Sequence, residues 1–178
     1  MSSSSSPSSP DASTPAAAAA DLVTERLVLR PWTTADVAAV LSDVRSERWA
    51  ADFPAEGDSV VAGLFAQFPA WLGGYGHRLV IERDTGLVVG SIGLFWPPTE
   101  GALEIGYGVV GSRRGRGYAA EATRALTEFA FTAPEVRTVF ADVEPANPAS
   151  LRVLEKAGFR RTAAQDGVVR YSCTRSAV

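Results

Sequence analysis

The segment Gly111-Ser112-Arg113-Arg114-Gly115-Arg116-Gly117-Tyr118-Ala119-Ala120-Glu121-Ala122 separates two different periodicities of this sequence. Before it, apolar residues alternate over positions 103–109, which predicts a β-strand. After it, apolar residues recur at helical spacing from Ala122 to Ala130. A strand that ends in a glycine-containing loop and continues into a helix presents unpaired backbone N–H groups at the positive end of the helix dipole. Such an arrangement binds phosphate groups.

The glycines and arginines of this segment support the phosphate interpretation. Gly115 and Gly117 allow the backbone to approach an anion closely. Three arginines between positions 113 and 116 concentrate positive charge in a chain that is otherwise acidic. The alternative is an arginine-rich helix start without a ligand, because Lys156 is the only lysine among the 17 cationic residues. The glycine pair, in its strand-loop-helix context, favours a phosphate-binding loop.

Composition excludes several classes of function. The 178 residues suggest one domain, and 46% apolar with 21% charged residues is typical of a globular protein. The net charge of −3 argues against a general nucleic-acid-binding role. Cys173 and His77 are the only residues of their types, so neither a disulfide within the chain nor a Cys/His zinc site can form. We expect no metal.

The N-terminal segment differs in composition from the rest of the chain. Residues 1–21 are almost entirely Ser, Pro and Ala, which predicts a disordered tail before a domain at 22–178. No cationic residue precedes Arg26, so neither a secretory nor a transit peptide is indicated. No run approaches the ~20 apolar residues that cross a bilayer. We expect a cytoplasmic protein, either a monomer or a homodimer, with no membrane or nucleic-acid partner.

The rest of the chain predicts a mixed α+β sheet with one helical crossover between the strands at 102–110 and 136–144. Helices are expected after Thr33, which forms a capping box with Asp36, and from about Asp58 until Pro69 and the Gly73-Gly74 pair. A helix capped by Asn147 is expected to end at Gly158. The other expected strands are 25–31, 77–83, 87–96, 159–162 and 168–174, with a turn at 165–167 between the last two.

Several motifs resemble the GNAT superfamily of N-acetyltransferases, specifically its ribosomal-protein-alanine (RimJ/RimL-type) branch. The resemblance covers residues 22–176, and its motifs occur in the family's order. They are Thr24–Pro31, Gly90–Leu94, Glu104–Tyr107, Gly115–Ala122 and Asn147–Phe159. The resemblance implies a GNAT-like, mostly antiparallel sheet whose central strand pair splays apart, and acetyl-CoA as the co-substrate.

The resemblance also implies the residues that bind the cofactor. The backbone of 115–119 would hold the pyrophosphate, Arg113 and Arg114 would add charge, and Asn147 would face the pantetheine arm near the sulfur. The full implied set is Val109, Val110, Arg113, Arg114, Gly115, Arg116, Gly117, Tyr118, Ala119, Asn147 and Ser150.

This sequence departs from the family pattern at two positions. Ser112 stands where Gln or Arg is frequent, which would weaken one contact. Leu154 stands where many members have the tyrosine that protonates the departing thiolate. Ser150 is the nearest replacement for that acid; alternatively, the thiolate leaves unprotonated.

The general base is expected to be a carboxylate near the acceptor amine. Glu104 is the first candidate, because it lies on the polar face of the strand beside the cofactor, although a solvated strand residue would show the same pattern. Glu144 is the second candidate. His77 has a suitable type of side chain, but its place in an outer strand favours a structural role.

The acceptor is expected to be a primary amine. The family branch favours a protein N-terminal α-amine, with a small-molecule or antibiotic amine as the alternative. Residues 34–72 contain acids beside aromatic residues, which suits a cation, although solvated acids and core aromatics explain them equally well. Two other classes are a non-catalytic CoA-binding sensor and a dinucleotide-binding protein, the latter because Gly115-x-Gly117-x-x-Ala120 fits a relaxed Rossmann fingerprint.

Overall fold

A computed structural model describes residues 20–42 and 44–177 of the chain. The predicted N-terminal tail therefore lies outside the described residues except for its last two positions. The first of these, Ala20, is held in place because its carbonyl accepts a hydrogen bond of 2.8 Å from Nη1 of the buried Arg78.

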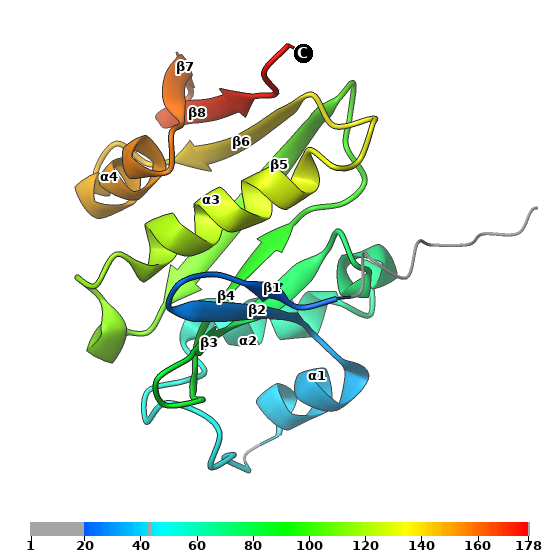
Figure 1. The fold of residues 1–178 in the computed structure, drawn as a ribbon, viewed down its shortest axis with the longest axis vertical. Coiled ribbons are helices and arrows are strands. Elements are labelled where there is room, and N and C mark those ends of the chain that lie inside the picture. Colours follow the sequence, from blue (N-terminus) through cyan, green and yellow to red (C-terminus); the bar gives the residue numbers. More distant parts are fainter. Residues whose placement is uncertain (1–19, 43, 178) are drawn as a thin grey trace, which may run out of the picture.

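One twisted sheet forms the centre of the described domain (Figure 1). Its strand order is β1-β2-β3-β4-β5-β6-β8-β7, and every neighbouring pair is antiparallel except β5 and β6. The predicted mixed, mostly antiparallel sheet is confirmed. The strands are β1 Leu22–Val23, β2 Leu27–Pro31, β3 His77–Glu82, β4 Val88–Leu94, β5 Ala102–Val109, β6 Thr138–Val143, β7 Arg160–Gln165 and β8 Val168–Thr174.

The central strands β5 and β6 pair over only part of their length. Their parallel register joins residues 102–104 of β5 to residues 138–140 of β6 and stops there. Beyond Glu104, β5 continues for five residues that pair only with β4. The chain between β5 and β6 forms α3, which is the predicted helical crossover. The strand pair thus splays apart, as the sequence resemblance implied.

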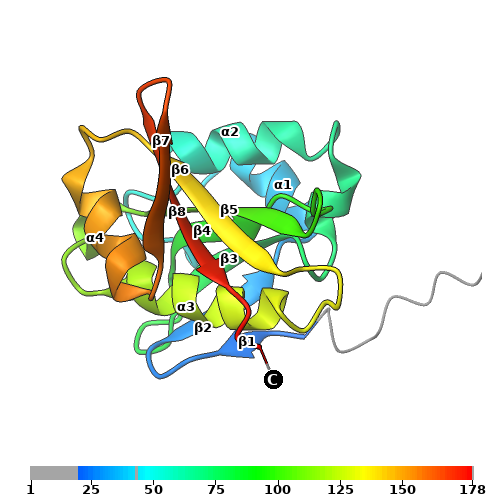
Figure 2. The ribbon, with the colours of Figure 1, turned by 90° about the horizontal axis from the view of Figure 1, so that it is seen from above.

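Helices cover both faces of the sheet. They are α1 Thr34–Leu41, α2 Glu56–Leu64, α3 Tyr118–Ala130 and α4 Pro148–Lys156, with short 3₁₀ turns at Pro69–Leu72 and Gly111–Arg113. Figure 2 shows α1 and α2 on one side of the sheet and α3 on the other. Every residue of β4 is buried, as expected for a strand with both of its faces covered.

Local sequence signals account for the starts of α1 and α4. The Thr33 hydroxyl accepts a hydrogen bond from the N–H of Asp36 at 3.1 Å, and the Asn147 side chain accepts one from the N–H of Ser150 at 3.2 Å. Both predicted N-caps are confirmed. By contrast, α2 begins at Glu56, before the predicted start at Asp58, because Asp58 bonds back to the N–H of Ala55 and is itself inside the first turn.

Other boundaries also differ from the sequence prediction, including those of the strands predicted at 87–96 and 136–144, which span Val88–Leu94 and Thr138–Val143. Helix α2 ends at Leu64 and does not continue to Pro69, so a separate 3₁₀ turn forms at Pro69–Leu72. The first strand of the closing hairpin extends three residues beyond its predicted end at Thr162, to Gln165. The connecting turn is short because Asp166 and Gly167 both adopt positive φ, at +54° and +76°.

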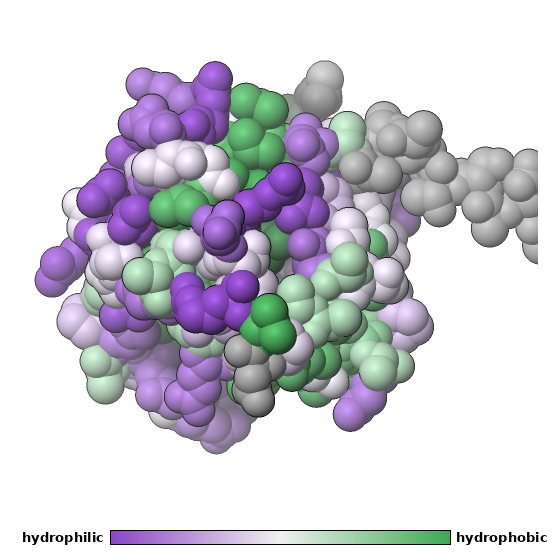
Figure 3. Space-filling model, turned by 90° about the horizontal axis from the view of Figure 1, so that it is seen from below, coloured by the Kyte–Doolittle hydropathy of each residue, from purple (hydrophilic) through white to green (hydrophobic). Residues whose placement is uncertain are grey.

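The surface of the domain is mixed in character. On the face in Figure 3, hydrophobic residues form small patches between hydrophilic ones. None of the helices in the described part of the chain is long and apolar enough to cross a membrane.

Candidate active site

The predicted phosphate loop is the connection between β5 and α3. A 3₁₀ turn leads to residues 114–117, and α3 begins directly after Gly117. Gly115 and Gly117 have φ angles of +78° and +81°, in the left-handed region that favours glycine. Among the described residues, no side chain caps the N-terminus of α3. An anion placed there would complete the hydrogen bonding of the first N–H groups of the helix.

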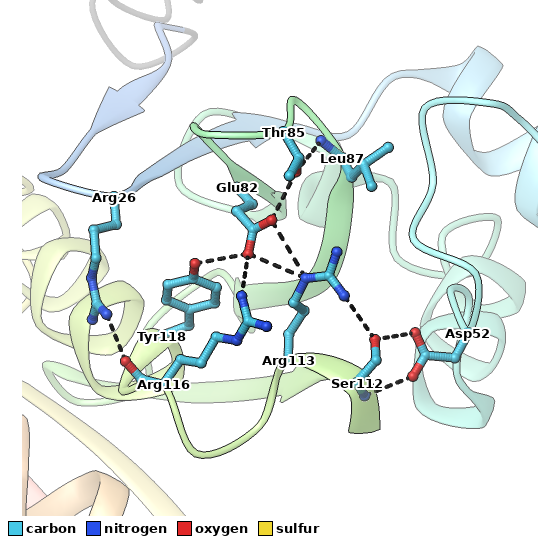
Figure 4. Close-up of polar contacts among 9 residues, drawn as sticks. All are labelled: Arg26, Asp52, Glu82, Thr85, Leu87, Ser112, Arg113, Arg116 and Tyr118. Carbon is cyan, nitrogen blue, oxygen red and sulfur yellow. Dashed lines mark hydrogen bonds and ion pairs between the residues drawn. The ribbon is translucent and has the colours of Figure 1, made fainter.

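A buried carboxylate beside the loop binds two loop residues and the first residue of α3 (Figure 4). Glu82, the last residue of β3, is 2% exposed. It accepts a hydrogen bond from the Tyr118 hydroxyl at 2.7 Å and pairs with Arg113 Nε at 3.2 Å and Arg116 Nη1 at 3.4 Å. Burial works to raise the pKa of Glu82, but hydrogen bonds from Tyr118 and Thr85 and the charge of Arg113 outweigh it and lower the pKa. An ionised acid therefore ties the loop to β3.

Two further contacts fix the ends of the loop. Asp52 accepts hydrogen bonds from the Ser112 N–H at 2.8 Å and from its hydroxyl at 2.7 Å, and these bonds lower the pKa of Asp52 (Figure 4). At the other end, Arg26 donates to the Arg116 carbonyl at 2.7 Å and pairs with Glu121 at 2.8 Å. The family resemblance implied that Ser112 would weaken one contact. In the structure, its N–H and hydroxyl group hold the start of the loop against Asp52.

A first cavity, of about 460 Å³, lies beside this loop. It is bounded by the free end of β5, the start of α3 and one face of α4. Of the cofactor-binding residues implied by the sequence, it brings together Val109, Arg113, Arg114, Gly115, Gly117, Tyr118, Ala119, Asn147 and Ser150. Val110, which is 1% exposed, and Arg116 are not among its lining residues.

The arginines of the loop differ in their surroundings. Arg113 lines the first cavity while paired to Glu82. The side chain of Arg114 is exposed, and its Nε donates to the Val109 carbonyl at 3.2 Å. Sequence reasoning missed two more cations of the same cavity, Arg152 and Lys156 of α4. The two residues are four positions apart in a helix capped at Asn147, so they lie on one helix face. This spacing could have identified them as a pair of cations beside the cofactor site.

Two hydroxyl groups meet where β5 faces α4. The Tyr107 hydroxyl lies 2.7 Å from Ser150 Oγ and 3.2 Å from the Ser150 carbonyl. Burial raises the pKa of Tyr107, even though the hydrogen bond to Ser150 works to lower it, so Tyr107 remains a neutral phenol. Leu154 is fully buried in the core. Sequence reasoning named Ser150 but missed Tyr107, which comes from a different element.

A second cavity, of about 290 Å³, lies between α2 and strands β3, β4 and β5. It shares four lining residues with the first cavity, namely Tyr107, Gly108, Val109 and Arg114. The two cavities therefore meet at the unpaired edge of β5, where one ligand from each could come into contact.

Glu104 lies in neither of these cavities. It lines a third cavity, of about 400 Å³, together with Phe95, Phe140 and Arg170. Burial and the charge of Asp142 raise the pKa of Glu104, while Arg170 works to lower it. Phe95 also lines the second cavity, so the third cavity is its neighbour along the sheet. Glu144, the second candidate base, is exposed.

His77 is a buried member of the second cavity. It is 2% exposed and lies against the rings of Phe65, Trp71 and Phe95 at centroid distances of 5.1–5.6 Å. Its Nε2 has no hydrogen-bond partner among the described residues. Burial lowers the pKa of His77 to about 4, so the ring is neutral near pH 7.

Solved structures that resemble this fold include acetyltransferases. An acetyltransferase from Agrobacterium tumefaciens str. C58 is 28% identical to this chain, with a TM-score of 0.62 over 88% of this chain and 95% of that one. The aminoglycoside acetyltransferase AAC(6′)-Ib, in complex with coenzyme A and kanamycin, is 25% identical, with a TM-score of 0.56 over 84% and 95% of the two chains.

Comparison of sequences alone leads to the same group. The N-acetyltransferase YjdG of Bacillus subtilis (strain 168), itself uncharacterized, is 33% identical over 87 residues, which are 48% of this chain and 52% of YjdG. The chain spans about half the length of the curated relatives it matches. Residues 26–160 match the family model of the acetyltransferase (GNAT) domain. With that match extending from β2 into β7, this chain belongs to the GNAT acetyltransferase family.

Proposed function

We propose that this protein transfers the acetyl group of acetyl-CoA to a primary amine. The observation that supports this most directly is the meeting of two cavities at residues 107–109 of β5. One cavity has a phosphate-type loop and the other is smaller. Acyl transfer requires two substrates whose reacting atoms meet while their remaining parts occupy separate sites.

The first cavity suits a cofactor with a phosphorylated tail. The positive-φ glycines and the uncapped start of α3 offer backbone N–H groups to a pyrophosphate. Arg114, Arg152 and Lys156 add positive charge for a further phosphate. Acetyl-CoA supplies an activated acyl group as a thioester. Arg113 and Arg116 serve mainly to hold the loop, since both are paired with Glu82.

Ser150 and Tyr107 are the proposed proton donors to the departing thiolate. Their hydroxyl groups form one hydrogen-bonded pair on the wall of the first cavity. Because Tyr107 remains protonated, it can replace a proton that Ser150 gives away. This pair would take the place of the tyrosine that this chain lacks at Leu154.

The acceptor is proposed to be a protein N-terminal α-amine, as the sequence resemblance implies. A small-molecule or antibiotic amine is the second candidate, and the similarity to AAC(6′)-Ib, which was solved with kanamycin, supports it. A non-catalytic CoA sensor would bind the cofactor and turn over neither class. Glu104 remains a sequence-based candidate for the base.

Calorimetry and a thiol-release assay test the proposal. We expect acetyl-CoA to bind and NADH to give no binding signal, and we expect CoA release with at least one class of amine. The panel comprises peptides with an N-terminal alanine, spermidine and kanamycin. Binding of NADH without binding of acetyl-CoA would disprove the assignment. Binding of acetyl-CoA without turnover of any amine would favour the sensor.

The hydroxyl pair gives a separate prediction. Ser150→Ala and Tyr107→Phe should each lower kcat by roughly tenfold or more, with little change in the affinity for acetyl-CoA. Leu154→Ala should instead destabilise the fold, by ~2–5 kcal/mol, because it leaves a cavity in the core. Steady-state kinetics and chemical denaturation separate the two effects. A larger loss of kcat in folded Leu154→Ala than in Ser150→Ala would remove Ser150 as the proton donor.

A further inference from the structure

The second cavity contains a buried carboxylate without a counter-charge. Asp58, in the first turn of α2, is 4% exposed and lines this cavity. One of its oxygens accepts a hydrogen bond from the Ala55 N–H at 2.8 Å, and the other accepts one from the Ser91 hydroxyl of β4. Among the described residues, no cationic side chain forms an ion pair with Asp58.

Helix capping explains only part of this arrangement. A cap requires one carboxylate oxygen, whereas the second oxygen of Asp58 is held by a strand 33 positions away in the sequence. Burying a carboxylate without a cation is costly, because water no longer solvates the charge. Burial indeed raises the pKa of Asp58, although its two hydrogen bonds work to lower it. A bound cation would supply the missing compensation.

The other walls of the second cavity fit an ammonium group on an apolar body. His77 is neutral near pH 7 and the ring of Phe95 is apolar, so neither repels a cation. Arg114 is the one cation among the lining residues, and it is exposed and shared with the first cavity. Gly108, one of the residues shared by the two cavities, leaves space open beside β5 at their junction, since a Cβ there would meet nothing within 4 Å.

We infer that Asp58, oriented by Ser91, binds the ammonium group of the acceptor and removes its proton. The inference rests on the proposed acetyl transfer and assigns the base to a residue other than Glu104. It also defines the acceptor as a compact group with a single positive charge, since the second cavity offers one carboxylate in about 290 Å³.

The reaction balances with the groups available. One ammonium proton moves to Asp58, which leaves a neutral amine with a free electron pair. That pair forms the C–N bond to the thioester carbonyl carbon, and the C–S bond breaks with its electrons on sulfur. A second proton leaves the nitrogen for solvent. The thiolate takes one proton from the Ser150 hydroxyl, Tyr107 replaces it, and solvent reprotonates Tyr107, so that one proton is released overall. Asp58 later releases its proton to solvent.

The decisive variant is Asp58→Asn in the full chain. An amide can accept from the Ala55 N–H and donate to the Ser91 hydroxyl, so this change removes charge while keeping shape and capping. With acetyl-CoA and an N-terminal-alanine peptide, kcat/KM at pH 7 should fall by about 100-fold. Acetyl-CoA affinity should stay within about twofold. Glu56→Gln, an exposed acid in the same helix turn, is the matched control.

The pH profile separates a base from a structural residue. Wild-type kcat/KM should rise with pH over the range in which Asp58 loses its proton, which gives a rising limb in the pH profile. Asp58→Asn should lack this limb. The variant should recover activity only at alkaline pH, where the amine is already neutral. Ser91→Ala removes one stabilising hydrogen bond from the carboxylate. It should therefore move the limb to higher pH, and this variant keeps the assignment testable if Asp58→Asn folds poorly.

Each outcome distinguishes the inference from the proposed function. Wild-type rates in folded Asp58→Asn, or loss of the limb in Glu104→Gln instead, would overturn the role of Asp58 while acetyl transfer stands. Calorimetry of the peptide in the presence of CoA gives a second readout, with binding at least tenfold weaker in Asp58→Asn. A wild type that neither acetylates nor binds any amine of the panel would overturn both.

Discussion

Replacing Gly117 by valine is expected to weaken acetyl-CoA binding by at least about 100-fold, or ~2.7 kcal/mol. Gly117 has a φ of +81°, which a β-branched residue adopts only with strain. A Cβ there would lie 3.3 Å from a guanidinium nitrogen of Arg26, the residue that holds the Arg116 carbonyl. The valine would also occupy the space through which a pyrophosphate reaches the backbone at the start of α3.

A matched glycine separates binding from backbone strain. Gly167, in the turn between β7 and β8, has a φ of +76°, and a Cβ at this position would meet nothing within 4 Å. Gly167→Val should lower thermal stability by a similar amount and leave acetyl-CoA affinity unchanged in calorimetry. If folded Gly117→Val bound acetyl-CoA as tightly as the wild type, the phosphate-loop assignment would be wrong.

The sequence was sufficient to predict those elements whose boundaries depend on neighbouring residues. The caps at Thr33 and Asn147 are confirmed because each depends on residues within one turn. Alternating apolar residues located most of the strands, and the helical crossover after Val109 required β5 and β6 to be parallel. The short β1 was not predicted, and β7, whose residues are all exposed, was predicted too short. The start of α2 was misplaced because Asp58 resembled a helix-starting residue. Its capping role at the third position emerged only from the bond to Ala55.

The site was less predictable because its contacts join distant parts of the chain. Tyr107 and Ser150 are separated by 43 positions, Asp58 and Ser91 by 33, and Glu82 and Tyr118 by 36. Neither hydrophobic periodicity nor the spacing of motifs predicts contacts between side chains so far apart in the sequence. Periodicity, the glycine pair and the Asn147 cap located the loop and the start of α4 because each signal is contiguous in sequence, and the family resemblance then implied their roles. The sequence could not reveal the contacts between these segments and the rest of the site. It could not reveal which acids are buried without a cation, because that depends on packing between α2 and the sheet.

Replacing Glu82 by glutamine is expected to destabilise the domain by about 3 kcal/mol, because it leaves the partly buried Arg113 without its counter-charge. Glu82 and Arg113 have side-chain exposures of 3% and 19%, so water compensates little of the loss. Arg116, at 50%, contributes less. For a domain of this size, the melting temperature should fall by roughly 10 °C.

The same substitution should weaken acetyl-CoA binding at least tenfold. Residues 113, 116 and 118 all contact the Glu82 carboxylate, so its neutralisation loosens the loop from both sides of the glycine pair. Asp142→Asn is the matched control, since it breaks a more exposed ion pair with Arg170 that lies away from the loop. Thermal melting and calorimetry measure the two effects. If Glu82→Gln bound acetyl-CoA more tightly, the freed Arg113 and Arg116 would be phosphate ligands, and their pairing with Glu82 would restrain binding and not support it.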